Sequence, residues 1–126
     1  MRKSFLLVSA AVEIAAGAAL ILVPSAIVGL LIGGTLDSSA AIAVARIAGA
    51  ALAILGLICW FASRHPESPT AMGVVTALLF YNATIVGILL YENLGHGLNA
   101  LGIWPAIIVH VALGIWCLAS VRPRAV

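Results

Sequence analysis

The sequence predicts an all-α polytopic membrane protein, a bundle of four transmembrane helices formed by one domain, residues 1–126. Composition is the first observation behind this prediction: 64% of the residues are hydrophobic and 8% are charged, whereas a soluble domain carries about 25% charged residues. The second observation is that the apolar residues form four long runs separated by polar or glycine-rich segments. A run of about 20 apolar residues is long enough to cross a bilayer. Lipid is therefore the expected solvent for most of the chain.

The first predicted helix runs from about residue 4 to 23, or on to residue 32 if Pro24 only kinks it. Proline lacks a backbone N–H and crowds the preceding helical turn. We therefore expect a break at Pro24, followed by a bent extension or a short interfacial helix over residues 25–32. The two glycines at 33–34 are expected to end it.

The other three helices follow from the same reasoning. The second is expected over about residues 40–62, because the polar residues 37–39 can cap its first turn. The third is expected over about residues 70–92, between a turn with two prolines and a glycine-rich loop. The fourth is expected over about residues 102–120, with Pro105 in its first turn, where proline is tolerated.

Basic residues at the helix ends predict the orientation of the chain. The loops at residues 33–39 and 93–100 contain no Lys or Arg. The positive charges that flank the helices all fall on the opposite side; they are Arg2, Lys3, Arg64, Arg122 and Arg124. Because cytoplasmic loops carry the excess of Lys and Arg, both termini are expected in the cytoplasm.

Several classes of function are disfavoured by what the chain lacks. It has no basic run or patch of basic and aromatic residues typical of nucleic-acid binding. Cys59 and Cys117 do not form a C-x-x-C pair and have no neighbouring ligands in the sequence, so no metal site is predicted. We expect both cysteines to be reduced and non-catalytic. The sequence identifies no cofactor.

Small residues recur along the second predicted helix. They lie at a four-residue spacing, which lets two helix backbones approach closely; they are Ala41, Ala45, Gly49 and Ala53. The stripe is interpreted as packing inside the bundle, and a homodimer face is the alternative.

Polar residues inside the predicted spans define the candidate site. They are Glu13, Arg46, Tyr81, Asn82 and His110. A charged residue at the centre of a membrane helix costs about 2.5–3.5 kcal/mol, so such residues are expected to face the bundle interior and to find partners. A helix rises about 1.5 Å per residue, so the position of a residue along its helix gives its depth in the bilayer. By this measure all of them except Arg46 lie near the midplane.

Arg46 lies nearer the outer surface in this scheme. Its side chain is long enough to extend inward to Glu13 or outward to Glu92 and Asp37. Glu92 shares a helix face with Tyr81 and joins the candidate binding residues. A purely structural reading remains open, with Glu13 and Arg46 as an ion pair and the other polar residues as contacts between helices.

The apolar segments carry a resemblance to a known family. They read VEIAAGAALILVPSAIVGLLIGG, VARIAGAALAILGLICWFA, YNATIVGILLY and IWPAIIVHVALGIW. They resemble small bacterial four-helix membrane proteins, loosely the DoxX-like group. The resemblance implies a four-helix bundle in a bacterial inner membrane, with Glu13, Arg46, Tyr81, Asn82 and His110 as recurrent residues. Some DoxX-type proteins are linked to quinone-coupled redox or sulfur chemistry, but this chain lacks a redox cysteine pair.

Three functions compete. In the first, an intramembrane polar pocket binds a lipophilic molecule such as a quinone or an isoprenoid, with Arg46, Tyr81, Asn82 and Glu92 as ligand-binding residues. In the second, a small membrane enzyme uses Glu13 and His110 as general acid and base on a lipid-soluble substrate. In the third, the chain is a structural or accessory subunit of a larger membrane complex, or forms a homodimer. Whether it is an enzyme stays open.

Overall fold

The computed structural model describes residues 1–121 and is helical over most of that range. Five helices follow one another, and their bounds are α1 (Arg2–Leu22), α2 (Pro24–Ile32), α3 (Ser39–Ala62), α4 (Pro69–His96) and α5 (Ile103–Val121). All except the short α2 are long and apolar enough to cross a membrane, which gives four candidate spans. The predicted fold class, an all-α polytopic protein with four transmembrane helices, is confirmed.

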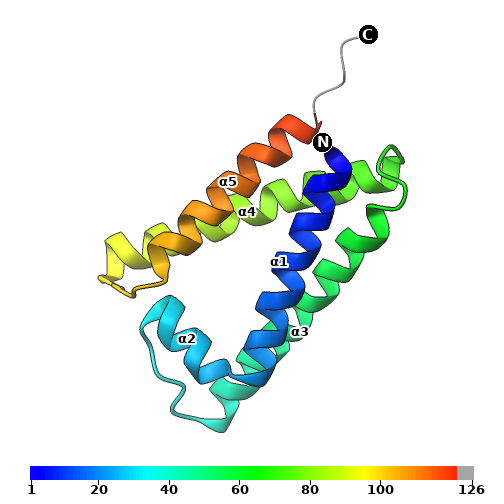
Figure 1. Cartoon of the computed structure of the whole chain (residues 1–126). Coiled ribbons are helices and arrows are strands. Elements are labelled where there is room, and N and C mark those ends of the chain that lie inside the picture. The colour runs from blue at the N-terminus through cyan, green and yellow to red at the C-terminus, as the bar shows by residue number, and fades with distance from the viewer. Residues whose placement is uncertain (122–126) are drawn as a thin grey trace.

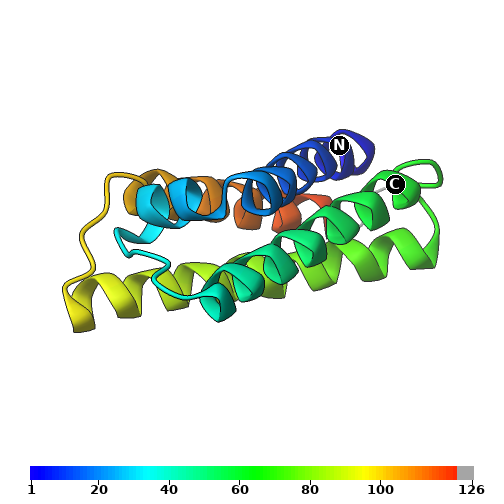
Figure 2. The same ribbon diagram turned by 90° about the horizontal axis from the view of Figure 1, so that it is seen from below.

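The long helices form two pairs that meet at one end and diverge toward the other. Helix α1 packs along α3, and α4 packs along α5. Figure 1 shows the two pairs converging where the N-terminus and the end of α5 lie, with α2 in the opening at the far end. Seen from below, α1, α2 and α5 form one layer and α3 and α4 the other (Figure 2).

Glycines allow the close contact between α1 and α3. A Cβ at Gly17 would lie 2.5 Å from the carbonyl oxygen of Gly49, and a Cβ at Gly49 would lie 2.7 Å from that of Gly17. Only residues without a side chain let the two backbones approach this closely. The small-residue stripe of α3 thus packs inside the chain at Gly49 and its neighbour Ala53.

The convergent end holds the hydrophobic core. Phe5 and Leu6 of α1 pack in one cluster with Val75 and Leu78 of α4. Phe5 also meets the ring of Trp116 edge-on, at 5.7 Å between centroids. The cluster includes both cysteines, which are free thiols and fully buried; they are Cys59 and Cys117.

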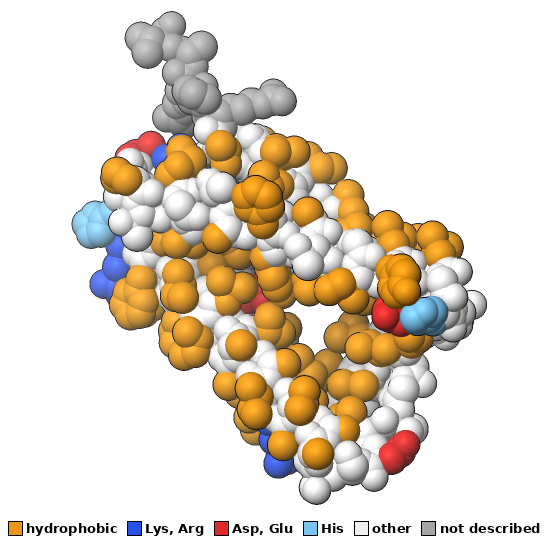
Figure 3. Space-filling view, turned by 180° about the vertical axis from the view of Figure 1, so that it is seen from behind, with side chains coloured by type: hydrophobic (Ala, Val, Ile, Leu, Met, Phe, Trp, Pro, Cys, Tyr) orange, Lys and Arg blue, Asp and Glu red, His pale blue; other side chains and the backbone are white. Residues whose placement is uncertain are grey.

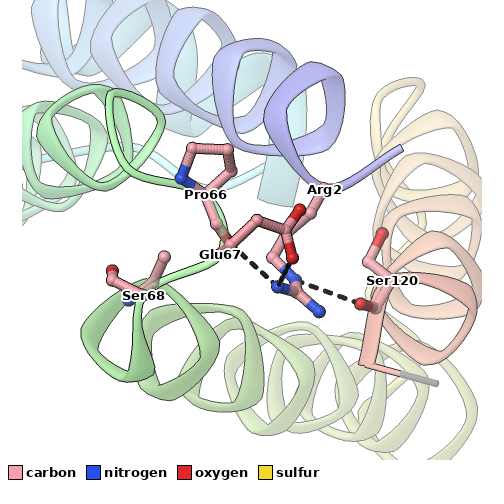
Figure 4. Close-up of polar contacts among 6 residues, drawn as sticks. Arg2, Pro66, Glu67, Ser68 and Ser120 are labelled. Atoms are coloured by element: carbon pink, nitrogen blue, oxygen red, sulfur yellow. Dashed lines mark hydrogen bonds and ion pairs between the residues drawn. The ribbon is translucent and has the colours of Figure 1, made fainter. Parts of the chain in front are cut away.

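Arg2 joins three segments at this same end (Figure 4). Its Nη1 atom donates to the carbonyl of Pro66 at 2.9 Å and lies 3.0 Å from Oε2 of Glu67 in the α3–α4 turn. Its Nε atom donates to the carbonyl of Ser120 at 3.3 Å, near the end of α5. Arg2 therefore holds the start of α1 against both helix pairs where they converge.

The helix ends follow local backbone chemistry. Val23 separates α1 from α2, and Pro24 is the first residue of α2, where its missing N–H removes no helical hydrogen bond. Ser38 and Ser68 cap α3 and α4 by accepting from a backbone N–H in the first turn. Helix α4 extends beyond its predicted end at residue 92 because Gly97, with φ of 69°, adopts the left-handed conformation that ends it.

Candidate functional site

Four of the polar residues selected from the sequence lie together between the helix pairs. Tyr81 on α4 donates a long hydrogen bond, 3.4 Å, from its hydroxyl to Oε2 of Glu13 on α1. Asn82, the next residue on α4, lies with its Oδ1 atom 2.8 Å from Nδ1 of His110 on α5. The rings of Tyr81 and His110 meet edge-on, with centroids 5.7 Å apart. The contacts connect three helices.

The local helical geometry explains how these side chains meet. Tyr81 and Asn82 are adjacent, so they point about 100° apart around α4: one side chain contacts α1 and the other contacts α5. Asn82 is 2% exposed and also donates from Nδ2 to the carbonyl of Leu78, at 2.7 Å. Glu13 is 3% exposed and shares a buried face of α1 with Ser9 and Gly17. A carboxylate placed there is kept away from lipid.

A cavity of about 470 Å³ lies beside this cluster, between α1, α2 and α5. Ala16 contributes to it from α1, Leu30 and Leu31 from α2, and Pro105 and His110 from α5. Among its lining residues, all of which belong to the described part of the chain, His110 is the only one with a polar side chain. Figure 3 shows the hollow between the helix pairs, with hydrophobic side chains around its rim.

The short helix α2 forms one wall of the cavity, and sequence reasoning missed this role. The backbone amide of Gly102, just before α5, donates to the carbonyl of Leu30 in the last turn of α2. This contact holds α2 against the α4–α5 connection and closes the end where the helix pairs diverge. Two features of the sequence could have predicted this contact. The carbonyls at the end of any helix lack partners within it, and a glycine stands at the start of the last helix.

A second cavity, of about 460 Å³, lies between α3 and α4 near their connecting turn. His65, Ser68 and Thr70 contribute polar groups to its lining. None of the four clustered polar residues lines it, so it is separate from the candidate site.

Arg46 lies outside the cluster. It is exposed on α3, and its Nε atom donates to the carbonyl of Ile21 at 3.2 Å. That carbonyl belongs to the last turn of α1, where backbone acceptors lack partners and a positive charge is favoured. Within residues 1–121, Glu13 forms no ion pair with Arg46 or any other residue. The break at Pro24 thus supplies Arg46 with a nearer acceptor than Glu13.

Glu92 is also placed away from the cluster. Its Oε2 atom lies 3.0 Å from Nδ1 of His96, one turn further along α4. Glu92 follows Tyr81 by three helical turns, or roughly 16 Å along the helix axis. Lying on one face of the helix therefore does not bring the side chains of Glu92 and Tyr81 together.

Comparison of the chain with protein-family models, with curated proteins and with solved structures found no match in any of the three. Within residues 1–121, no group of three or more His, Cys, Asp or Glu side chains is arranged to hold a metal ion.

Proposed function

We propose that this small integral membrane protein binds a lipophilic small molecule, such as a quinone or an isoprenoid, in the cavity beside His110. One observation carries the proposal: an apolar cavity of about 470 Å³ has a single polar side chain in its lining. Small-molecule sites commonly enclose about 300–1,000 Å³ and combine apolar walls with a few polar groups that orient the ligand. The chain of an isoprenoid would occupy the apolar part and its head group would contact His110.

The neighbouring polar residues serve to hold His110 in place. Asn82 bonds to one ring nitrogen, Tyr81 packs against the ring, and Glu13 accepts from Tyr81. Buried polar groups that satisfy one another fix a side-chain position more firmly than apolar packing alone. In this proposal Arg46 and Glu92 stabilise helix ends and do not contact the ligand.

An acid–base enzyme is the second candidate, and it rests on the contacts of Tyr81. Tyr81 contacts both Glu13 and His110, so the two titratable groups are linked through one hydroxyl-bearing ring. If the chain is an enzyme, it converts the bound molecule into a product; if it is only a binding protein, it releases the molecule unchanged. Recovery of the ligand after incubation with the protein, followed by mass analysis, separates the two.

The membrane and the orientation are part of the same proposal. We place the chain in a bacterial inner membrane, as its DoxX-like pattern suggests, with both termini in the cytoplasm. Arg2 and Arg64 lie at the convergent end of the described chain, and Arg122 and Arg124, which also supported this orientation, lie outside the described residues. The cavity, next to α2 and the α4–α5 connection, would then lie in the outer half of the bilayer.

Native mass spectrometry of the detergent-purified protein tests the proposal. We expect a stoichiometric small-molecule adduct on the wild-type chain that is lost on His110→Phe. The matched control is Ile108→Phe, on the same helix at a side chain that is 63% exposed, which should keep the adduct. A clean apo mass with co-purifying subunits would contradict ligand binding and favour the structural-subunit alternative.

A further inference from the structure

We infer that the head group recognised by His110 is a hydroxyl, as in a prenol or a hydroquinone, and not a carbonyl, as in an aldehyde or a quinone. The inference rests on the proposed function and narrows it to one ligand chemistry. It follows from the directions of two hydrogen bonds, those of Asn82 and of His110.

The contact with Leu78 fixes the orientation of the Asn82 amide. Its Nδ2 atom lies 2.7 Å from the carbonyl oxygen of Leu78. A backbone carbonyl only accepts hydrogen bonds, so the donating NH₂ group of the amide must face it. The reversed amide would place two acceptor oxygens 2.7 Å apart at a residue that is 2% exposed, where they repel each other and the amide oxygen has no donor. Oδ1 of Asn82 therefore points to His110.

The orientation of the Asn82 amide determines which nitrogen of the His110 ring carries the hydrogen. Oδ1 of Asn82 is an acceptor, and it lies 2.8 Å from Nδ1 of His110. Nδ1 must therefore carry the hydrogen. In a neutral imidazole the other nitrogen then has a free lone pair and acts as an acceptor. The apolar lining favours the neutral ring, since no described residue forms an ion pair with His110 and an unpaired buried charge is costly.

The remaining ring nitrogen of His110, Nε2, is free to accept from a ligand. His110 lines the cavity, and within residues 1–121 no hydrogen bond uses its Nε2 atom. Among the described residues, the buried polar side-chain atoms without a hydrogen-bond partner are Ser9 Oγ and Ser120 Oγ. Nε2 is not among them, so it remains accessible. A hydroxyl can donate to Nε2, whereas a carbonyl would set two acceptors face to face and lose about tenfold or more in affinity.

Two matched ligand pairs test the inference on the detergent-purified full chain. The first pair is a C20 prenol and its aldehyde, and the second is a prenylated hydroquinone and its quinone. We expect the hydroxyl member of at least one pair to bind at least about tenfold more tightly than its carbonyl partner. The pair that shows this preference identifies the ligand as a prenol or a hydroquinone.

The other outcomes separate this inference from the proposed function. Equal binding within both pairs, or tighter binding of the carbonyl members, would overturn the hydroxyl assignment and leave the binding proposal standing. Absence of binding by all four compounds would overturn both.

The Asn82→Leu variant adds a test of the hydrogen-bond direction. Loss of the amide frees His110 to carry its hydrogen on either nitrogen, so the preference for the hydroxyl should fall toward equality. Asn93→Leu is the matched control, because Asn93 is on the same helix and bonds to the carbonyl of Leu98 outside the cavity. This control should keep the full preference.

A spectroscopic measurement on the wild-type chain tests the position of the hydrogen on His110 without relying on the folding of a variant. Nitrogen-15 NMR of the histidine-labelled wild-type chain should show a protonated Nδ1 and an unprotonated Nε2 for His110. A hydrogen on Nε2 would overturn the inference, whatever the stability of the Asn82 variant.

Discussion

The backbone amide of Gly102 lies 2.9 Å from the carbonyl oxygen of Leu30 and donates a hydrogen bond to it. The contact joins residues that are far apart in the sequence, at the end where the helix pairs diverge. Glycine is required there, because a Cβ at this position would lie 2.7 Å from that same oxygen. The cavity wall formed by α2 thus depends on one glycine.

Gly102→Ala is therefore expected to push α2 away from the α4–α5 connection. The strain should lower the free energy of unfolding by about 1–3 kcal/mol and weaken ligand retention. Thermal unfolding in detergent and native mass spectrometry measure the two effects. Gly87→Ala is the control, since a Cβ there would meet nothing within 4 Å beyond the neighbouring backbone of its own helix. Unchanged stability and binding in Gly102→Ala would contradict the role given to this contact.

Gly17→Ala should separate α1 from α3. The new Cβ would lie 2.5 Å from the carbonyl oxygen of Gly49 and 2.6 Å from the amide nitrogen of Ala53, both rigid backbone atoms. We expect a loss of about 1–3 kcal/mol in the free energy of unfolding, read from unfolding curves in a fixed detergent. Gly73→Ala, at a position with open space around it, should be neutral or slightly stabilising. Equal behaviour of the two variants would show that the helices do not pack this way.

Glu13 and Arg46 should behave as independent residues. Glu13 bonds to Tyr81 and Arg46 bonds to the carbonyl of Ile21, so no interaction links their side chains. In a double-mutant cycle, Glu13→Gln and Arg46→Gln should add within about 0.5 kcal/mol in the free energy of unfolding. A coupling well above that value would mean that the two side chains form the ion pair considered from the sequence.

Reporter fusions check the orientation of the chain. A reporter at the C-terminus should be active only in its cytoplasmic form, and one inserted at Gly97 only in its periplasmic form, because the basic residues flank one side of the bundle. Gly97 is exposed and ends α4, so an insertion there disturbs little packing. Periplasmic activity at the C-terminus would reverse the proposed topology.

Much of the fold follows from the sequence because it depends on segment length and composition. Four long apolar runs predict four spans, and the missing N–H of Pro24 predicts the break before α2. The association of Glu13, Tyr81 and His110 follows from similar depth within different helices. These features are local, or depend only on position along a helix.

The remaining features depend on contacts between distant segments. The environment of Arg46 is set by a carbonyl at the end of another helix, that of Ile21. The divergence of the helix pairs depends on where backbones approach, as at Gly17 and Gly49, and helical spacing alone does not give the angle between pairs. The cavity arises from that divergence and from the position of α2, so its lining could not be read from the sequence.

The cavity that His110 lines has otherwise apolar walls, and this determines how much of the site is filled by ligand. A lipophilic molecule that reaches His110 past these apolar walls arrives from the hydrocarbon phase, so the relevant concentration is its mole fraction among the lipids. Adding empty micelles or vesicles at a constant total amount of ligand would then empty the site by dilution within the apolar phase. Adding the same volume of buffer would leave the site filled.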